Sequence, residues 1–253
     1  MNTPPPLPRR LLAEFLGSAF LAALVIGSGI AAVQLTPNDV GLQLFYNSAA
    51  TAAGLFAIIL MFGPISGGHF NPVVSLVDAT FGGLSWRDAR AYIPAQIAGC
   101  SFGAVVANLM FSLTAISIST HHRASPAHLL GEVVATLGLI LLIFALVRSH
   151  RAAMAPAAVG AYIGAAYWFT SSTSFANPAI TIGRMFSNTF AGIAPASVPA
   201  YVIAQLVGGG LAIAVIRILY PDVTAAEAAE VVVPHDQADG HHPATPRPEG
   251  ARA

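Results

Sequence analysis

Long apolar stretches, separated by short segments rich in polar residues, Gly and Pro, occupy most of the first 220 residues. A helix needs about 20 mainly apolar residues to cross the hydrocarbon of a bilayer. Six stretches meet this requirement: 11–33, 42–62, 91–111, 129–147, 153–170 and 198–219. The pattern predicts an all-α membrane protein with six transmembrane helices.

Two of the connections, residues 63–90 and 171–197, contain apolar turns that are too short to cross the bilayer. In each, a run of small polar residues ends in Asn-Pro, at Asn71 and at Asn177. Asn is a favoured N-cap, and Pro fits the first helical position because its missing N–H would have no intrahelical partner there. Each connection is therefore predicted to hold a half-helix that enters the membrane and returns.

The order of elements repeats along the chain. Corresponding spans carry an acid and an amide in each half: Glu14 and Gln96 in the first, Glu132 and Gln205 in the second. We take residues 11–111 and 129–220 as the two repeats of one channel domain. Because three spans per repeat is an odd number, the second copy must be inverted in the membrane. Such repeats place their binding region near the midplane, between the halves.

Composition agrees with this class of protein. The chain is 55% hydrophobic and only 9% charged, whereas soluble domains are nearer a quarter charged. It has no Lys and a formal net charge of zero, so nothing suggests a nucleic-acid partner. The bilayer is the expected environment, with the cell membrane (the inner membrane in a bacterium) as the location.

The arginines predict the orientation. Cytoplasmic flanks of membrane spans carry an excess of Lys and Arg. With the N-terminus inside, seven arginines flank cytoplasmic ends: Arg9, Arg10, Arg87, Arg90, Arg148, Arg151 and Arg217. Only Arg123 and Arg184 fall outside. Both termini are therefore predicted to be cytoplasmic, with residues 1–10 as a short N-terminal segment.

Residues 221–253 are rich in Ala, Pro, His and acidic residues, which predicts a disordered cytoplasmic tail. His235, His241 and His242 could in principle hold a metal ion, but their spacing is unlike that of ordered sites. A solvated tail is the favoured interpretation, and no metal site is predicted.

Residues 66–73 read Ser-Gly-Gly-His-Phe-Asn-Pro-Val, and residues 175–180 read Phe-Ala-Asn-Pro-Ala-Ile. Inverted repeats that carry such Asn-Pro half-helices resemble the aquaporin, or major intrinsic protein, family over residues 11–220. Val73 stands where that family usually has Ala, which the second motif keeps at Ala179. The resemblance implies two half-helices meeting head to head, a pore in each subunit, a homotetramer, and a passive channel with no cofactor.

The pore implied by this resemblance can be described residue by residue. Two helix N-termini at mid-membrane create a positive centre that repels cations. Asn71 and Asn177, each followed by its proline (Pro72 and Pro178), would donate side-chain N–H groups to a passing oxygen. Glu14 and Glu132 would accept from the loop backbone, and Gln96 and Gln205 would do the same or pack helices. Backbone carbonyls would form an acceptor line: Gly67, Gly68, His69, Phe70, Thr173, Phe175 and Ala176.

The family also has a constriction on the outer side of its pore. Counting from the two Asn residues gives its four positions here: Thr51, Ala165, Ser174 and Ile180. None is aromatic or His, and Ile180 replaces the usual Arg, so a wider and less polar gate is expected. Arg184 could face the outer vestibule, or equally the lipid head groups or a neighbour. Channels without the filter Arg resemble bacterial members associated with arsenic handling.

We expect a passive channel for small uncharged solutes: water, glycerol-like polyols and metalloid hydroxides such as arsenite. The alternative is an ion- or proton-coupled transporter that uses Glu14 and Glu132 as a relay, since ionisable groups inside spans usually mean function or a firm partner. An intramembrane enzyme is not favoured, because His69 is the only His in the expected pore and no paired acids accompany it.

Overall fold

The structure, a computed structural model, describes residues 5–149 and 151–220. The predicted tail, with its three histidines, lies outside these residues. The elements follow in chain order: α1 (Leu7–Leu35), α2 (Val40–Ser66), α3 (Pro72–Phe81), α4 (Trp86–Met110), α5 (Pro126–Arg148), the 3-10 helix η1 (Ala152–Met154), α6 (Ala155–Phe169), α7 (Pro178–Gly183), the 3-10 helices η2 (Arg184–Phe186) and η3 (Pro195–Ser197), and α8 (Val198–Leu219).

Six helices within the described part of the chain are long and apolar enough to cross a membrane: α1, α2, α4, α5, α6 with η1, and α8 with η3. The prediction of an all-α protein with six spans is confirmed. Four helices, α1, α2, α4 and α5, begin a few residues before the predicted apolar stretches, and in α2, α4 and α5 a polar N-cap lies outside the apolar run. In α4, for example, Ser85 Oγ accepts from the backbone N–H of Asp88 at 3.0 Å, so the helix begins at Trp86.

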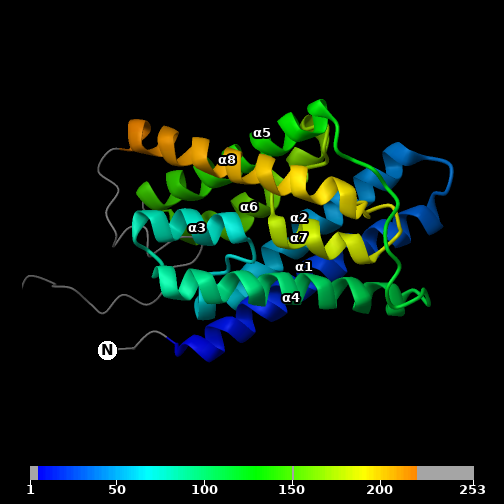
Figure 1. The fold of residues 1–253 in the computed structure, drawn as a ribbon, viewed down its shortest axis with the longest axis horizontal. Helices are drawn as coiled ribbons and strands as arrows, with labels where there is room; N and C mark the ends of the chain where they lie inside the picture. The colour runs from blue at the N-terminus through cyan, green and yellow to red at the C-terminus, as the bar shows by residue number, and fades with distance from the viewer. Residues whose placement is uncertain (1–4, 150, 221–253) are drawn as a thin grey trace, which may run out of the picture.

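The two short helices α3 and α7 each begin directly after an Asn-capped turn. Asn71 Oδ1 accepts from the N–H of Val73 at 2.9 Å. Asn177 Oδ1 accepts from the N–H groups of Ala179 at 2.9 Å and Ile180 at 3.3 Å. Figure 1 shows α3 and α7 end to end in the middle of the bundle, running in from opposite ends of the molecule.

Small residues allow the long helices to approach closely. A Cβ on Gly103 of α4 would lie 2.1 Å from the carbonyl oxygen of Ala19 in α1. In the second half, a Cβ on Gly208 of α8 would lie 2.6 Å from the carbonyl oxygen of Val133 in α5. Glycine lets helix backbones touch in this way in membrane proteins. The α1–α4 and α5–α8 contacts are therefore built on the same principle in both halves.

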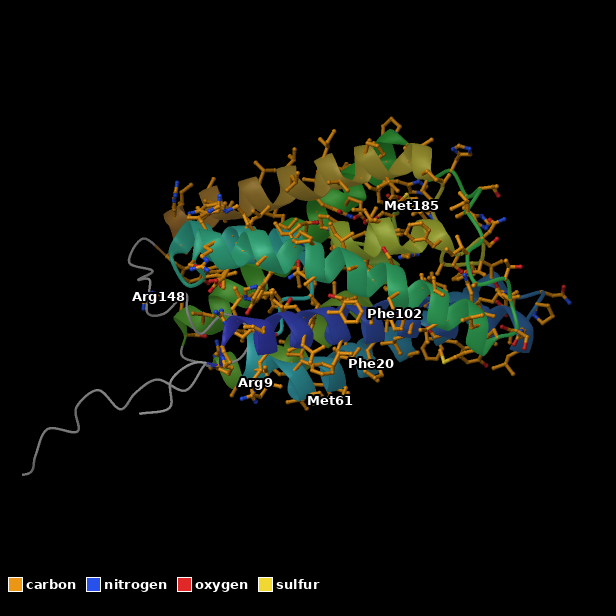
Figure 2. The ribbon with its side chains drawn as sticks, turned by 60° about the horizontal axis from the view of Figure 1, so that its bottom comes forward. Arg9, Phe20, Met61, Phe102, Arg148 and Met185 are labelled. Carbon is orange, nitrogen blue, oxygen red and sulfur yellow. The ribbon has the colours of Figure 1, made fainter. Side chains whose placement is uncertain are left out.

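The outside of the bundle is apolar and its interior is partly polar. Phe20, Met61 and Phe102 are about half exposed and point outward from the helices (Figure 2). Inside, carboxylates and amides are fully buried, Glu14 and Glu132 among them. Figure 2 also places Arg9 and Arg148 toward the same end of the molecule. This distribution is that of a multi-pass membrane protein whose polar groups face inward.

Candidate functional site: a cavity between the half-helices

A cavity of about 60 Å³ lies where the N-termini of α3 and α7 meet. Both asparagines, Asn71 and Asn177, line it, together with residues of the two segments that precede them. The rest of the wall is largely aliphatic and includes Leu21, Leu55, Ile59, Leu139, Ile143 and Val159. A narrow space with few polar groups in an apolar wall suits a small solute that exchanges only a few hydrogen bonds.

The asparagines link the two half-helices to each other. Asn71 Nδ2 donates to the carbonyl oxygen of Ala176 at 2.8 Å, and Asn177 Nδ2 donates to that of Phe70 at 2.7 Å. An amide nitrogen carries two N–H groups, so this cross-link leaves one on each Asn. Each asparagine thus caps its own helix, ties it to the opposite segment, and keeps one donor for the cavity that it lines.

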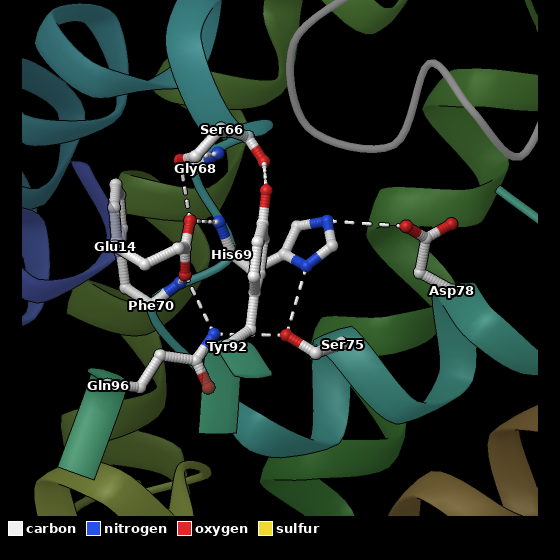
Figure 3. Close-up of polar contacts among 9 residues, drawn as sticks. All are labelled: Glu14, Ser66, Gly68, His69, Phe70, Ser75, Asp78, Tyr92 and Gln96. Atoms are coloured by element: carbon white, nitrogen blue, oxygen red, sulfur yellow. Dashed lines mark hydrogen bonds and ion pairs between the residues drawn. The ribbon is translucent and has the colours of Figure 1, made fainter. Parts of the chain in front are cut away.

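Glu14 of α1 fastens the first re-entrant segment (Figure 3). Its Oε1 accepts from the N–H of His69 at 3.0 Å and from Ser66 Oγ at 2.6 Å. Its Oε2 accepts from the N–H of Phe70 at 2.7 Å and from Gln96 Nε2 at 2.7 Å. Both carboxylate oxygens therefore hold structural hydrogen bonds.

Glu132 of α5 does the same in the second half. Its Oε1 accepts from the N–H of Phe175 at 2.9 Å, and its Oε2 accepts from the N–H of Ala176 at 2.8 Å. Gln205 Nε2 donates to Glu132 Oε2 at 2.6 Å and to Thr181 Oγ1 at 2.9 Å. The pairs Glu14–Gln96 and Glu132–Gln205 thus make equivalent contacts with the two segments.

These contacts hold an unfavourable backbone conformation. The residues directly before the asparagines, Phe70 and Ala176, have φ of 48° and 49°, in the left-handed region that L-residues rarely adopt. Each such residue costs on the order of 1–3 kcal/mol. The N–H groups of these same residues are those that the carboxylates of Glu14 and Glu132 bind. The strained turns are therefore offset by charge-assisted hydrogen bonds.

Only part of the predicted line of carbonyl acceptors borders the cavity. Five of its members line the cavity: Gly68, His69, Phe70, Phe175 and Ala176. Gly67 and Thr173 are not part of the wall. Gly67 is instead the C-cap of α2, with φ of 90° and its N–H bonded to the carbonyl oxygen of Gly63.

The side chain of His69 lies in a polar cluster that sequence reasoning missed (Figure 3). Its Nε2 is 3.3 Å from Asp78 Oδ2, and its Nδ1 is 3.0 Å from Ser75 Oγ. Both partners belong to α3. The only hint in the sequence was an acid inside an otherwise apolar half-helix. No group of three or more potential metal ligands occurs among the residues that the structure describes.

Three of the four positions obtained by counting line the cavity: Thr51, Ser174 and Ile180. The placement of Ala165 in the constriction was wrong. Ala165 is exposed, and the cavity wall contains Tyr167 of the same helix instead. Residues two apart on a helix point about 200° apart, so only one of these two can face inward. Tyr167 Oη lies 3.2 Å from Thr51 Oγ1, and the two hydroxyls share a hydrogen bond.

Arg184, for which the sequence left two orientations open, also lines the cavity. Its side chain is buried, and its Cζ lies 3.4 Å from the centroid of the Phe175 ring. Its Nε donates to the carbonyl oxygen of Ala191. The alternative of a guanidinium directed at lipid head groups does not agree with this placement.

Comparisons with known proteins point to one family. The family model described as Major intrinsic protein matches residues 3–174 and 165–242. The aquaglyceroporin AqpS of Rhizobium meliloti (strain 1021) is 50% identical over 211 residues, which are 83% of this chain and 90% of that protein.

More distant similarities agree. The glycerol uptake facilitator protein of Streptococcus pneumoniae (strain ATCC BAA-255 / R6) is 29% identical over 190 residues, 68% of this chain and 80% of that protein. The X-ray structure of the aquaglyceroporin from Plasmodium falciparum aligns with a TM-score of 0.66 at 18% identity and covers 86% of this chain and 99% of that one. This last likeness concerns the fold.

Proposed function

Because the chain belongs to the major intrinsic protein family, whose members are passive channels rather than enzymes, we propose that it conducts small uncharged solutes through a pore in each subunit. The observation that carries the proposal is the cavity into which the Asn71 and Asn177 caps both point, between two helix N-termini. The helix ends disfavour cations there, and the amides offer donors to solute oxygens.

The solutes proposed are water, glycerol-like polyols and metalloid hydroxides such as arsenite. Glycerol is supported by the names of the relatives, an aquaglyceroporin and a glycerol uptake facilitator. The metalloid hydroxides are proposed because Ile180, without charge, lines the cavity beside Thr51 and Ser174. A neutral hydroxide of this size needs the same few donors and acceptors as glycerol, while the Tyr167 hydroxyl adds one polar contact that counting did not predict.

The arrangement in the membrane belongs to the same proposal. We take residues 11–111 and 129–220 as inverted repeats in a homotetramer in the cell membrane, with both termini cytoplasmic. Arg9 and Arg148, at the same end of the molecule, agree with one cytoplasmic face (Figure 2). In this orientation, what we call the outer mouth of the cavity is formed by Thr51, Tyr167, Ser174, Ile180 and Arg184.

A proton- or ion-coupled transporter is not favoured. A relay through Glu14 and Glu132 would need a carboxylate that can take and release a proton toward the pore. Every oxygen of both groups instead accepts at least one hydrogen bond from the protein.

The test of the gate is Ile180→Arg, with Ile180→Leu as the matched control. Purified proteins in liposomes are compared for glycerol and arsenite flux. We expect Ile180→Arg to lower the glycerol flux and the arsenite flux by about tenfold, because the longer charged side chain narrows the cavity and makes its wall more polar. The Leu variant should retain both. Unchanged flux of the larger solutes in a folded Ile180→Arg protein would contradict the proposed gate.

A further inference from the structure

Arg184 is a buried cation without an acidic partner among the residues that the structure describes. Its side chain is only 3% exposed, yet it borders the cavity. Arg184 takes part in neither of the ion pairs Arg10–Asp88 and His69–Asp78. A buried charge with no counter-charge is costly, so such groups in membrane proteins usually serve function.

Most of the N–H donors of Arg184 are free to bind a solute in the cavity. A guanidinium has five N–H donors, and the described residues accept only from Nε, through the Ala191 carbonyl. Its two terminal nitrogens have no hydrogen-bond partner among the described residues. Neither of them is among the fully buried polar atoms that lack a partner. They therefore remain accessible on the cavity side, at the same wall as Ile180.

Two neighbours fix this guanidinium in place. The Phe175 ring lies under Cζ at 3.4 Å, a cation–π contact that stabilises the charge without neutralising it. Arg123 acts through the loop that Arg184 binds: its Nε donates to the carbonyl oxygen of Gly192 at 2.7 Å and its Nη2 to that of Phe190 at 2.9 Å. These bonds hold the residues on either side of Ala191, the acceptor of Arg184.

We propose that Arg184 is a specificity-determining residue of the outer mouth: its guanidinium excludes cations and donates hydrogen bonds to the oxygens of neutral solutes. This inference rests on the proposed function. It places the positive charge of the mouth seven residues after Asn177, beyond Ile180. The mouth is then uncharged at Ile180 and still positive at Arg184. Where screening is poor, one fixed charge raises the barrier for a cation strongly.

The experiment compares K⁺ and proton leak with glycerol flux in liposomes that contain the full chain. Arg184→Leu should raise the leak by about tenfold or more, because the fixed charge is gone. Arg184→Lys keeps the charge and should leave the leak within about twofold of wild type, while glycerol flux falls because the planar donor array is lost. Arg87→Leu, which removes an exposed arginine of α4, is the matched control.

Two further variants separate charge from structure. Arg184→Gln removes the charge but can still donate to Ala191, so it carries the same test if the Leu variant does not fold. Adding Ile180→Arg to Arg184→Leu should restore a low leak, which a merely structural role for Arg184 would not explain.

Each outcome is decisive. A leak of folded Arg184→Leu or Arg184→Gln equal to that of Arg87→Leu would overturn this inference alone. Absence of glycerol flux in the wild type would overturn the proposed function and this inference with it.

Discussion

At the scale of single residues, the two buried glutamates organise the site. Glu14 and Glu132 hold the N–H groups of the strained residues Phe70 and Ala176, and each also accepts from a glutamine. The asparagines can link the two half-helices only while the turns at Phe70 and Ala176 keep their conformation. We therefore propose that the acids act on conduction through the backbone and not by carrying protons.

Replacing Glu14 with Gln tests this role. The amide offers one acceptor in place of two, so at least one backbone donor is left unpaired, and we expect a loss of about 2–5 kcal/mol in stability. Thermal unfolding in detergent measures it. Asp39→Asn is the matched control, since Asn caps α2 as well as Asp does. Uptake that depends on a pH gradient, abolished by Glu14→Gln in a protein of unchanged stability, would favour the relay instead.

Residue-level prediction from sequence succeeded where the cause is local. The caps of α3 and α7 follow from an Asn next to a Pro. Tyr167 could not be predicted by counting back from Asn177, because the count fixes no helical phase for α6. The contact of His69 with Asp78 depends on how the chain folds back along α3, which no local pattern records.

At the scale of elements, glycines determine how the helices pack around the cavity. Gly103 lets α4 rest on the backbone of α1, and Gly208 lets α8 rest on that of α5. The sequence predicted the spans because apolar length is a direct signal. It did not predict which faces meet: Gly160 of α6 contacts α2, where a Cβ would lie 2.6 Å from the carbonyl oxygen of Ala52.

Gly103→Val should prevent the close α1–α4 contact. Its Cβ would overlap the Ala19 carbonyl, and we expect a loss of about 2–4 kcal/mol or failure to fold. Gly210→Val on α8 is the control, since a Cβ there meets nothing within 4 Å. Monodispersity and thermal midpoint in the same detergent compare the two. Equal stability of both variants would show that this packing contact is not needed.

At the scale of the whole molecule, the bundle encloses a mostly aliphatic cavity with a few polar groups inside an apolar shell. Six long helices of the described residues provide the shell, and α3 and α7 run into it from opposite ends (Figure 1). The class of protein could be predicted from the sequence because composition and the two Asn-Pro segments point the same way. The shape of the outer mouth could not, since it combines Thr51, Tyr167 and Arg184 from three separate elements.

The most direct test of the channel is the swelling of liposomes that contain the wild-type protein, exposed to a glycerol gradient. We predict that they swell faster than protein-free vesicles, without a pH or ion gradient, and at a rate proportional to the glycerol gradient. Swelling that requires a pH or ion gradient, or that equals the rate of protein-free vesicles, would contradict passive conduction through this cavity.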